Sequence, residues 1–172
     1  VESLEDLNTQ QMESGKTVTE AVHAAVLKVG ENVKISKASF LKVEEGFIFG
    51  YLHGQGLGVL VEVSADNEQA GRNVAMHIAA LSPVSVSDSD IPESLMAEEK
   101  AVYIKQLEDS GKPDQIKEKI ILGKLKKFAS GLCLYGQAYV KEPKLTVKEY
   151  LSEQKLSVLG FKRYALGEGE SS

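Results

Sequence analysis

Hydrophobic residues that repeat with a helical period alternate along this chain with shorter apolar runs that repeat with the period of a β-strand. Thr17 and Glu20 form a capping box, in which the hydroxyl and the carboxylate satisfy free amides at the start of a helix. The pattern therefore predicts a helix that runs to about Val29 and ends at Gly30 in a left-handed cap. One face of this helix should pack inward; its apolar positions are Val18, Val22, Ala25, Val26 and Val29.

The period changes toward that of a strand after this helix. Val33 and Ile35 alternate with polar residues, and apolar runs bounded by turn residues follow at 40–43, 47–52 and 57–63. These runs predict an antiparallel meander. The last of them contains too few polar positions to alternate cleanly, so we expect a central strand that is covered on both faces.

Helical spacing returns in the middle of the chain. A helix over 68–81 should cover one face of the sheet with an apolar stripe; the stripe consists of Ala70, Val74, Ile78 and Leu81. Two longer helical patterns follow, at 92–110 and 113–129, and Gly111-Lys112-Pro113 separates them. Because the connection is short, these helices should form an antiparallel hairpin that projects as an arm.

The sequence pattern near the end of the chain repeats the pattern near its beginning. Thr146 and Glu149 repeat the capping box of Thr17 and Glu20, and a strand-like run at 158–166 follows. Two explanations stay open, an internal duplication and the chance recurrence of common helix-start residues. This repeated pattern predicts that the last strand joins the same sheet as the earlier strands.

These patterns indicate an α+β fold, with an antiparallel sheet covered by helices and a protruding antiparallel helical hairpin. Residues 1–16 are expected to form an N-terminal linker or helix remnant. The core α+β subdomain should comprise 17–91 and 130–172, and the hairpin insertion 92–129.

Composition narrows the classes of protein that the chain can belong to. Of its 172 residues, 42% are hydrophobic and 26% are charged, which is typical of a globular domain. The net charge of -5 argues against broad binding of nucleic acid or of acidic membranes, and no apolar run approaches the roughly 18 to 20 residues of a membrane span. The chain starts at Val1, so we expect processing or a longer parent protein.

The single cysteine favours a reducing compartment. Cys133 lies in an apolar run and has no cysteine in the chain with which to form a disulfide. We expect a buried structural thiol rather than a reactive one. The expected location is the cytoplasm, with the matrix or stroma of an organelle as the alternative.

The two glycine-rich patterns do not satisfy the requirements of nucleotide-binding motifs. Ser14-Gly15-Lys16-Thr17 ends like a phosphate-binding loop but has Gln10 where the first glycine of that motif belongs, so a helix start is the better interpretation. Gly54, Gly56 and Gly58 resemble a dinucleotide-binding loop, but a strand follows them, which favours a hairpin turn. The turn, which adjoins His53, also suits contact with a protein partner.

The remaining polar candidates do not form a catalytic or metal-binding set. His23, His53 and His77 lack metal-ligand spacing, and His77 adjoins the apolar stripe of its helix, so we expect a hydrogen-bonded core histidine. The basic residues Lys124, Lys126 and Lys127 should lie in the last turns of their helix, where cations offset the helix dipole. The sequence thus predicts no catalytic residue, no cofactor and no bound metal.

Short segments along 17–169 resemble signature segments of the elongation factor Ts family, and they occur in the family's order. The resembling segments are Val29-Gly30-Glu31-Asn32, Tyr51-Leu52-His53-Gly54, Gly58-Val59-Leu60-Val61, Ala75-Met76-His77-Ile78-Ala79-Ala80, Ser82-Pro83, Gly111-Lys112-Pro113, Gly123-Lys124-Leu125-Lys126-Lys127-Phe128, Gln137-Ala138-Tyr139-Val140, Gly160-Phe161-Lys162-Arg163 and Gly167-Glu168-Gly169.

The resemblance implies a function as well as an α+β core. Members of this family bind elongation factor Tu carrying GDP, deform its nucleotide and magnesium site, and so promote GDP release. They act without covalent chemistry, and the helical hairpin serves in dimer contacts. The resemblance therefore implies elongation factor Tu as the partner, with a homodimer through the hairpin as a further possibility, and no direct contact with nucleic acid or membrane.

Partner-binding residues follow from the resemblance wherever the local motif matches. They are Val29, Gly30, His53, Arg72, Asn73, Val140 and Lys141. The apolar members should act as buried anchors and the polar ones should set register. Arg72, Asn73 and Lys141 depart from residues that are common in the family.

The chain also departs from the family in what it lacks. Full-length members carry an N-terminal helical domain and a Thr-Asp-Phe motif, whereas Ala65-Asp66-Asn67 stands at the position that resembles the motif. We therefore expect a C-terminal core fragment that binds elongation factor Tu but exchanges GDP poorly alone. The alternative is a structural or dimerisation module without exchange activity.

Overall fold

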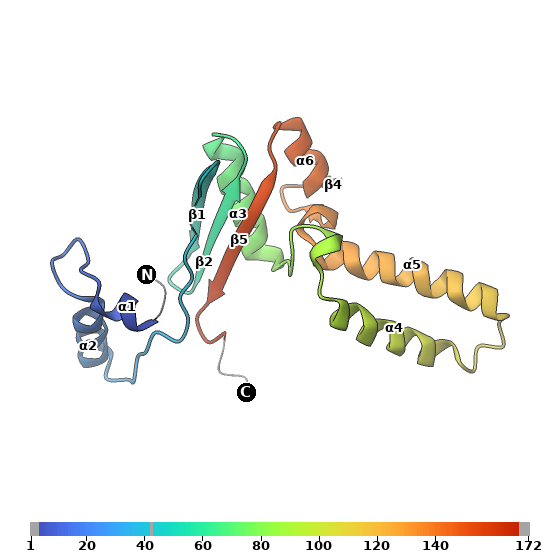
Figure 1. Cartoon of the computed structure of the whole chain (residues 1–172), viewed down its shortest axis with the longest axis horizontal. Coiled ribbons are helices and arrows are strands. Elements are labelled where there is room, and N and C mark those ends of the chain that lie inside the picture. Colours follow the sequence, from blue (N-terminus) through green and yellow to red (C-terminus); the bar gives the residue numbers. More distant parts are fainter. Residues whose placement is uncertain (1–3, 42, 169–172) are drawn as a thin grey trace. The chain divides into compact units, whose positions relative to one another are not determined.

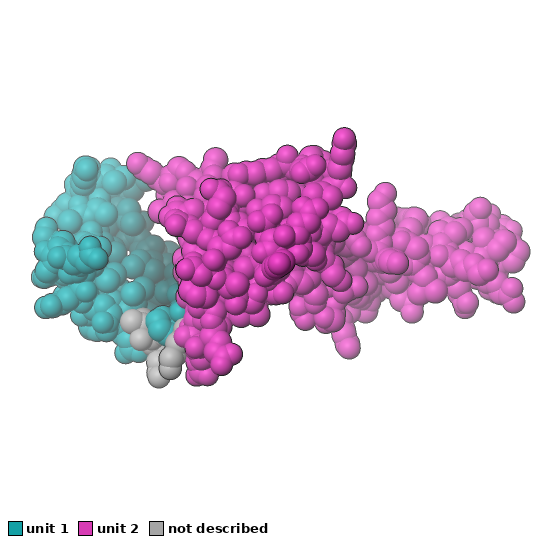
Figure 2. All heavy atoms as spheres, turned by 90° about the horizontal axis from the view of Figure 1, so that it is seen from above, with its two compact units in different colours: residues 1–42, 167–172 teal, residues 43–166 magenta. Residues whose placement is uncertain are grey.

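The computed structural model describes residues 4–41 and 43–168, which belong to two compact units that Figure 2 colours separately. Unit 1 comprises residues 1–42 and 167–172, and unit 2 comprises residues 43–166. The helical hairpin falls inside unit 2. The boundaries of these two units differ from those of the domains expected from the sequence. The expected domain organisation stays a prediction.

The described residues of unit 1 form two helices, α1 (Leu4–Thr9) and α2 (Val18–Val29). The predicted capping box is present, because the Glu20 amide donates to Thr17 Oγ1 at 3.2 Å and the Thr17 amide donates to Glu20 Oε2 at 2.8 Å. Gly30 ends α2 with a φ of 75°, as predicted. The described residues of α1 and α2 include no buried side chain, so the apolar stripe of α2 is at most half-buried within this unit.

The strands expected between 33 and 43 do not form. None of the described residues 33–41 belongs to a strand, and neither does residue 43. Residue 42 lies outside the described part of the chain. A strand is stabilised by its neighbours in a sheet, and no strand of unit 1 is available within its described residues. The meander therefore begins later than the sequence predicted.

Unit 2 contains a three-stranded antiparallel sheet of β1 (Phe47–His53), β2 (Leu57–Val63) and β5 (Val158–Ala165), in the order β1-β2-β5. The last strand joins this sheet, as predicted, and β2 is central. Helix α3 (Glu68–Leu81) lies across one face of the sheet (Figure 1). The α+β fold class is thus confirmed.

The core of unit 2 lies between α3 and the sheet. Val59, Val61 and Val63 of β2 are buried beneath Val74 and Ile78 of α3, together with neighbouring apolar residues. On the opposite face of β2, Leu60 remains 41% exposed. The expectation that β2 is covered on both faces is therefore wrong, because α3 covers only one of them. Leu81 is also 45% exposed and does not belong to the inward stripe of α3.

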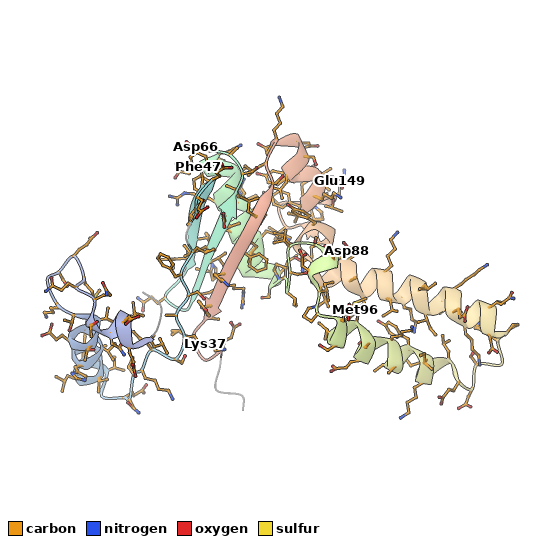
Figure 3. All side chains as sticks on the ribbon, viewed as in Figure 1. Lys37, Phe47, Asp66, Asp88, Met96 and Glu149 are labelled. Atoms are coloured by element: carbon orange, nitrogen blue, oxygen red, sulfur yellow. The ribbon has the colours of Figure 1, made fainter. Side chains whose placement is uncertain are left out.

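Two antiparallel helices, α4 (Glu93–Leu107) and α5 (Asp114–Leu132), extend from this core (Figure 1). Lys124 of α5 donates to Gln106 Oε1 at 2.8 Å, and its ammonium lies 4.8 Å from the centre of the Tyr103 ring. At the base of the pair, Met96 (labelled in Figure 3) packs against the small cluster that contains the buried Cys133. The expectation of a buried thiol is confirmed.

The prediction for the basic residues on α5 is wrong. The helix continues to Leu132, so Lys124, Lys126 and Lys127 lie before its last turn, which contains no basic residue. Their role as cations at the helix terminus is therefore excluded, and Lys124 instead joins the two helices of the pair.

A short segment after α5 completes unit 2. It contains the two-stranded sheet of β3 (Ala138–Tyr139) and β4 (Glu142–Thr146), which the sequence did not predict, and then α6 (Val147–Glu153). The predicted capping box is present at the start of α6: the Glu149 amide donates to Thr146 Oγ1 at 3.2 Å, and Glu149 is labelled in Figure 3. The unit also includes two short 3-10 turns, η1 (Asp88–Asp90) and η2 (Leu134–Gly136).

We predict that Gly71→Ala destabilises unit 2. A Cβ at this position would lie 2.1 Å from Cδ2 of Phe49, so the new methyl group must displace the Phe49 ring or push α3 and β1 apart. Overpacking of this kind costs about 1 to 3 kcal/mol and should outweigh the gain of about 1 kcal/mol from the better helix former. Urea unfolding should show a lower free energy of unfolding.

Gly123→Ala is the matched control for this experiment. Gly123 lies within α5, is exposed, and has no atom within 4 Å of a Cβ built on it. This variant should gain about 0.5 to 1 kcal/mol from helix propensity alone. Equal changes in both variants would show that close packing at Gly71 is not limiting.

Candidate partner-binding surface

An apolar hollow of about 390 Å³ opens on unit 2 between α3, the β1–β2 hairpin and the turn that joins β3 to β4. Its lining is mostly aliphatic, with polar atoms at the rim; the lining residues are Tyr51, His53, Leu57, Met76, Ala79, Ala80 and Val140. A concave apolar surface with few polar groups is the usual shape of a site that takes an apolar side chain.

Local sequence explains how α3 contributes to this hollow. Met76, Ala79 and Ala80 follow one another at i, i+3 and i+4, so they share a face of the helix. That face is next to the inward stripe of Val74 and Ile78. Because the alanines are small, they leave the space that Met76 and the opposing β-hairpin enclose.

His53 lies at the end of β1, on the rim of the hollow. Its Nδ1 is 3.1 Å from the Tyr51 hydroxyl, and the two rings are stacked with their centres 6.2 Å apart. Gly54 follows with a φ of 58° and begins the tight turn to β2. The predicted hairpin turn is confirmed, and it leaves the His53 ring exposed.

Val140 and Lys141 form the turn between β3 and β4. Lys141 Nζ donates to Asn73 Oδ1 at 2.6 Å, and Asn73 Nδ2 donates to the Tyr150 hydroxyl at 3.0 Å. Val140 is 39% exposed and lines the hollow. The structure thus places three of the predicted residues, Asn73, Val140 and Lys141, in one neighbourhood, and both Val140 and His53 line the hollow.

The buried His77 lies directly behind this turn. It is 0% exposed, and its Nδ1 accepts a hydrogen bond from the Val140 amide at 3.2 Å. Its Nε2 lies 3.0 Å from Gln137 Oε1. Burial lowers the pKa of His77, and the hydrogen bond with Gln137 partly offsets this effect. The prediction of a hydrogen-bonded core histidine is confirmed.

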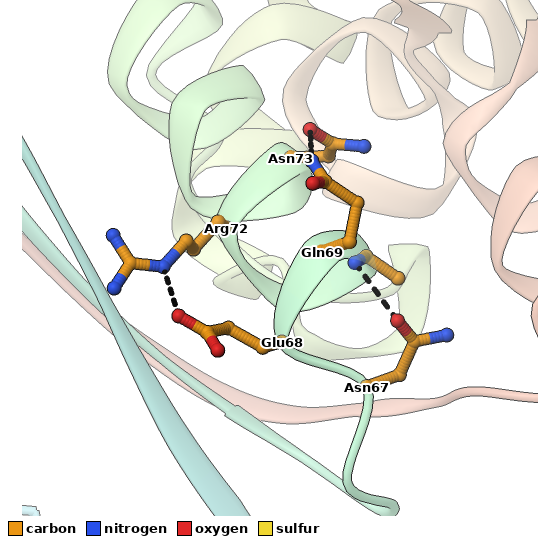
Figure 4. Close-up of polar contacts among 6 residues, drawn as sticks. Asn67, Glu68, Gln69, Arg72 and Asn73 are labelled. Carbon is orange, nitrogen blue, oxygen red and sulfur yellow. Dashed lines mark hydrogen bonds and ion pairs between the residues drawn. The ribbon is translucent and has the colours of Figure 1, made fainter.

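Arg72 lies outside the hollow, at the beginning of α3. Figure 4 shows its ion pair with Glu68, in which Nε and Oε1 are 2.8 Å apart, and the hydrogen bond from Gln69 to Asn73 one turn away. Asn67 caps the helix by accepting from the Ala70 amide at 3.1 Å. Because both members of the ion pair are exposed, it adds little to stability.

Val29 and Gly30 belong to unit 1 and not to the unit that holds the hollow. Val29 is 59% exposed, and a Cβ built on Gly30 would have no atom within 4 Å. These two residues form an exposed helix end. Their part in binding stays a prediction.

Most residues of the hollow were not predicted from the sequence, although one signal was present. Ala75, Met76, Ala79 and Ala80 extend the apolar surface of α3 beyond a single stripe. A helix that is apolar around much of its circumference needs a second contact surface. Tyr51 and Leu57 carry no comparable signal, since strands of an open sheet expose alternate residues in any case.

The groups around the hollow are suited to non-covalent binding. Among residues 4–41 and 43–168, no three or more histidine, cysteine, aspartate or glutamate side chains are grouped so that they could hold a metal ion. None of the helices in those ranges is long and apolar enough to cross a membrane. The hollow offers an apolar floor, an imidazole and a phenol hydroxyl at its edge, and a cation on the neighbouring turn.

Fold and surface together define a class: an α+β protein with a half-covered antiparallel sheet, a long pair of helices and an apolar surface hollow. Residues 1–168 match the family model described as elongation factor TS. The chain belongs to the elongation factor Ts family, as its signature segments predicted.

Individual members of the family agree with this assignment. The chain is similar to elongation factor Ts of Legionella pneumophila, with 38% identity over 167 residues that cover 97% of the chain and 57% of the relative. It is 41% identical to elongation factor Ts of Halorhodospira halophila over 171 residues, or 99% of the chain and 58% of the relative. The chain thus spans little more than half the length of the curated relatives it matches.

We predict that unit 2 loses stability as the pH falls from about 7.5 to about 5.5. The pKa of His77 in the folded chain is below the 6.5 of a free imidazole, so the unfolded chain takes up a proton first. The stabilising effect of the neutral ring is therefore complete above pH 6.5 and declines as the pH falls toward the lowered pKa. Urea unfolding at several pH values measures this change.

His77→Asn is the control variant for the pH series, because it keeps a polar side chain but cannot titrate in this range. The decline between the two pH values should be smaller in the variant. If both proteins decline equally, groups other than His77 cause the pH dependence.

Proposed function

We propose that this chain is the part of an elongation factor Ts that binds elongation factor Tu carrying GDP and promotes release of the nucleotide. The observation that carries the proposal is the match of the family model over residues 1–168. The hollow supports it, because the sequence-predicted His53 and Val140 both line this apolar surface. The site of action would be the cytoplasm or the matrix or stroma of an organelle.

The proposed mechanism needs no covalent step. An exchange factor accelerates release when it binds the nucleotide-free partner more tightly than the nucleotide-bound partner. An apolar side chain of elongation factor Tu would occupy the hollow as an anchor, while His53 and Lys141 would set its register. Docking of this kind supplies the binding energy that a strained nucleotide site on the partner requires.

We further propose that the chain alone binds well but exchanges slowly. It spans 57% to 58% of the length of the cited relatives. The stretch Ala65-Asp66-Asn67 directly precedes α3: the Asn67 amide donates to the Ala65 carbonyl at 3.0 Å, and the Asn67 side chain caps the helix. Asp66, labelled in Figure 3, lies at this start. A stretch whose last residue caps a helix is a poor substitute for an intruding Thr-Asp-Phe motif.

A structural or dimerisation module is the second candidate, and one observation favours it. The α4–α5 pair exposes large apolar side chains; Val102 is 47%, Ile104 45%, Ile116 47% and Leu122 66% exposed. Apolar positions of this kind suit a contact with a second copy of the chain. We propose the homodimer through this pair of helices as an addition to partner binding.

The proposal predicts that the chain binds elongation factor Tu loaded with a fluorescent GDP analogue. Calorimetry would follow binding, and fluorescence decay after addition of excess GDP would follow release. We expect saturable binding with only a small acceleration of release. Absence of binding would overturn the proposal, and self-association without binding, seen by sedimentation, would favour the dimerisation module.

His53→Ala tests where the partner binds. The side chain is exposed, and its hydrogen bond with Tyr51 is local, so the variant should fold normally. We expect its affinity to fall about 5- to 30-fold, as for a contact residue near the centre of an interface. His23→Ala, on the exposed side of α2, is the matched control and should bind unchanged. Equal affinity of both variants would remove His53 from the site.

A further inference from the structure

The hairpin that contains the Val140–Lys141 turn is too short to fix the position of the turn by itself. It joins β3, which has two residues, to β4, which has five, and the pairing shifts register next to the turn. A two-stranded hairpin of this length is marginal in water on its own. Its position over the hollow must therefore come from contacts outside the hairpin.

Side-chain contacts tie the turn and its flanking residue, Tyr139, to the rest of unit 2. The Val140 amide donates to His77 Nδ1, and Lys141 Nζ donates to Asn73 Oδ1. The Tyr139 ring stacks on Tyr150 with centres 4.1 Å apart, and its centre lies 6.0 Å from that of the His77 ring. The lysine contact is exposed and therefore weak. Among these contacts, the hydrogen bond with His77 holds the backbone of the turn itself.

The hydrogen bonds around His77 determine which nitrogen carries its proton. Nδ1 accepts from an amide, so it must be unprotonated, and Nε2 must then carry the hydrogen and donate to Gln137 Oε1. Gln137 Nε2 donates in turn to the carbonyl of Gly131 at 2.8 Å. The three hydrogen bonds therefore form a chain in which each group donates to the next: the Val140 amide to His77, His77 to Gln137, and Gln137 to the end of α5.

This relay has no alternative arrangement that satisfies every group. Moving the proton to Nδ1 would set its hydrogen against the Val140 amide, and turning the ring over would place carbon atoms where Nδ1 and Nε2 now lie. His77 is 0% exposed and Gln137 is 8% exposed, so water has little access to replace a lost partner. A buried donor without an acceptor is costly, which makes the orientation of the ring unique.

We propose that His77 is the positioning residue of the partner-binding surface: it holds the Val140 amide and so sets the turn that borders the hollow. This inference rests on the proposed function, since it assigns a role in binding elongation factor Tu to a residue that cannot touch the partner. The Val140 side chain can complete the hollow only while its backbone is held in this way.

Two variants each keep one hydrogen bond of the His77 ring and remove the other. In His77→Asn, the side-chain oxygen can take the place of Nδ1 and accept from Val140, while the donor to Gln137 is lost. In His77→Gln, the side-chain amide can take the place of Nε2 and donate to Gln137, while the Val140 amide loses its acceptor. Both variants remove the ring and one hydrogen bond, so a purely structural role predicts similar losses in both.

The experiment measures the affinity of the full chain and both variants for elongation factor Tu carrying GDP, with folding verified by circular dichroism. We expect His77→Gln to bind about tenfold more weakly and His77→Asn within about threefold of the unchanged chain. If the affinity falls equally in both variants, or in neither, the inference about His77 is overturned. Binding by the unchanged chain would still uphold the proposed function. Failure of the unchanged chain to bind overturns both.

Nuclear magnetic resonance of the nitrogen-15-labelled chain tests the geometry without the partner and without any variant. A coupling across the hydrogen bond between the Val140 nitrogen and His77 Nδ1, together with the Nε2-protonated ring, is the expected result. Exchange of the Val140 amide hydrogen should be slow in the unchanged chain. A ring protonated at Nδ1, or no coupling, overturns the inference.

Discussion

The close approach of α3 to the β-sheet is the constraint on which unit 2 depends. Gly71 lies so near the Phe49 ring that a methyl group has no room, and this contact lets Val74 and Ile78 bury Val61 and its neighbours completely. The same approach fixes the rotation of the helix. It turns Met76 and the small alanines beside it toward the β1–β2 hairpin, and it carries His77 into the interior.

The candidate surface is a consequence of this packing rather than a separate feature. One side of α3 forms the floor of the hollow, and the buried imidazole on the neighbouring side holds the turn that closes it. His77 and Val140 are 63 residues apart in the chain, and Asn73 and Lys141 are 68 apart. Binding at the proposed surface would therefore rely on the same contacts as folding. An exchange factor gains from this arrangement, because a rigid surface loses little conformational entropy when its partner docks.

The sequence was sufficient where local chemistry determines structure. The capping boxes at Thr17 and Thr146 and the left-handed Gly30 predicted helix boundaries, and the glycines after His53 predicted the β1–β2 turn. It failed where the outcome depends on distant residues. The alternating residues at 33 and 35 have the pattern of a strand but no partner strand among the described residues of their unit, and β3 is too short to show any period.

The candidate site shows the same limit. Family resemblance supplied His53 and Val140, but only the fold shows that they share a hollow and that Arg72 lies apart from it. His77 could be predicted as a core histidine from its place beside the apolar stripe. Its contact with the turn could not be predicted, because the register between α3 and the β3–β4 hairpin has no local signal in either segment.

The central claim is that the surface around the hollow is where elongation factor Tu docks. Hydrogen–deuterium exchange of the chain, with and without elongation factor Tu carrying GDP, tests this claim most directly. We expect slower exchange at residues 51–57 and 138–142 when the partner is bound, with little change in the outer turns of α4 and α5. Slower exchange confined to α4 and α5, with none around the hollow, would contradict it.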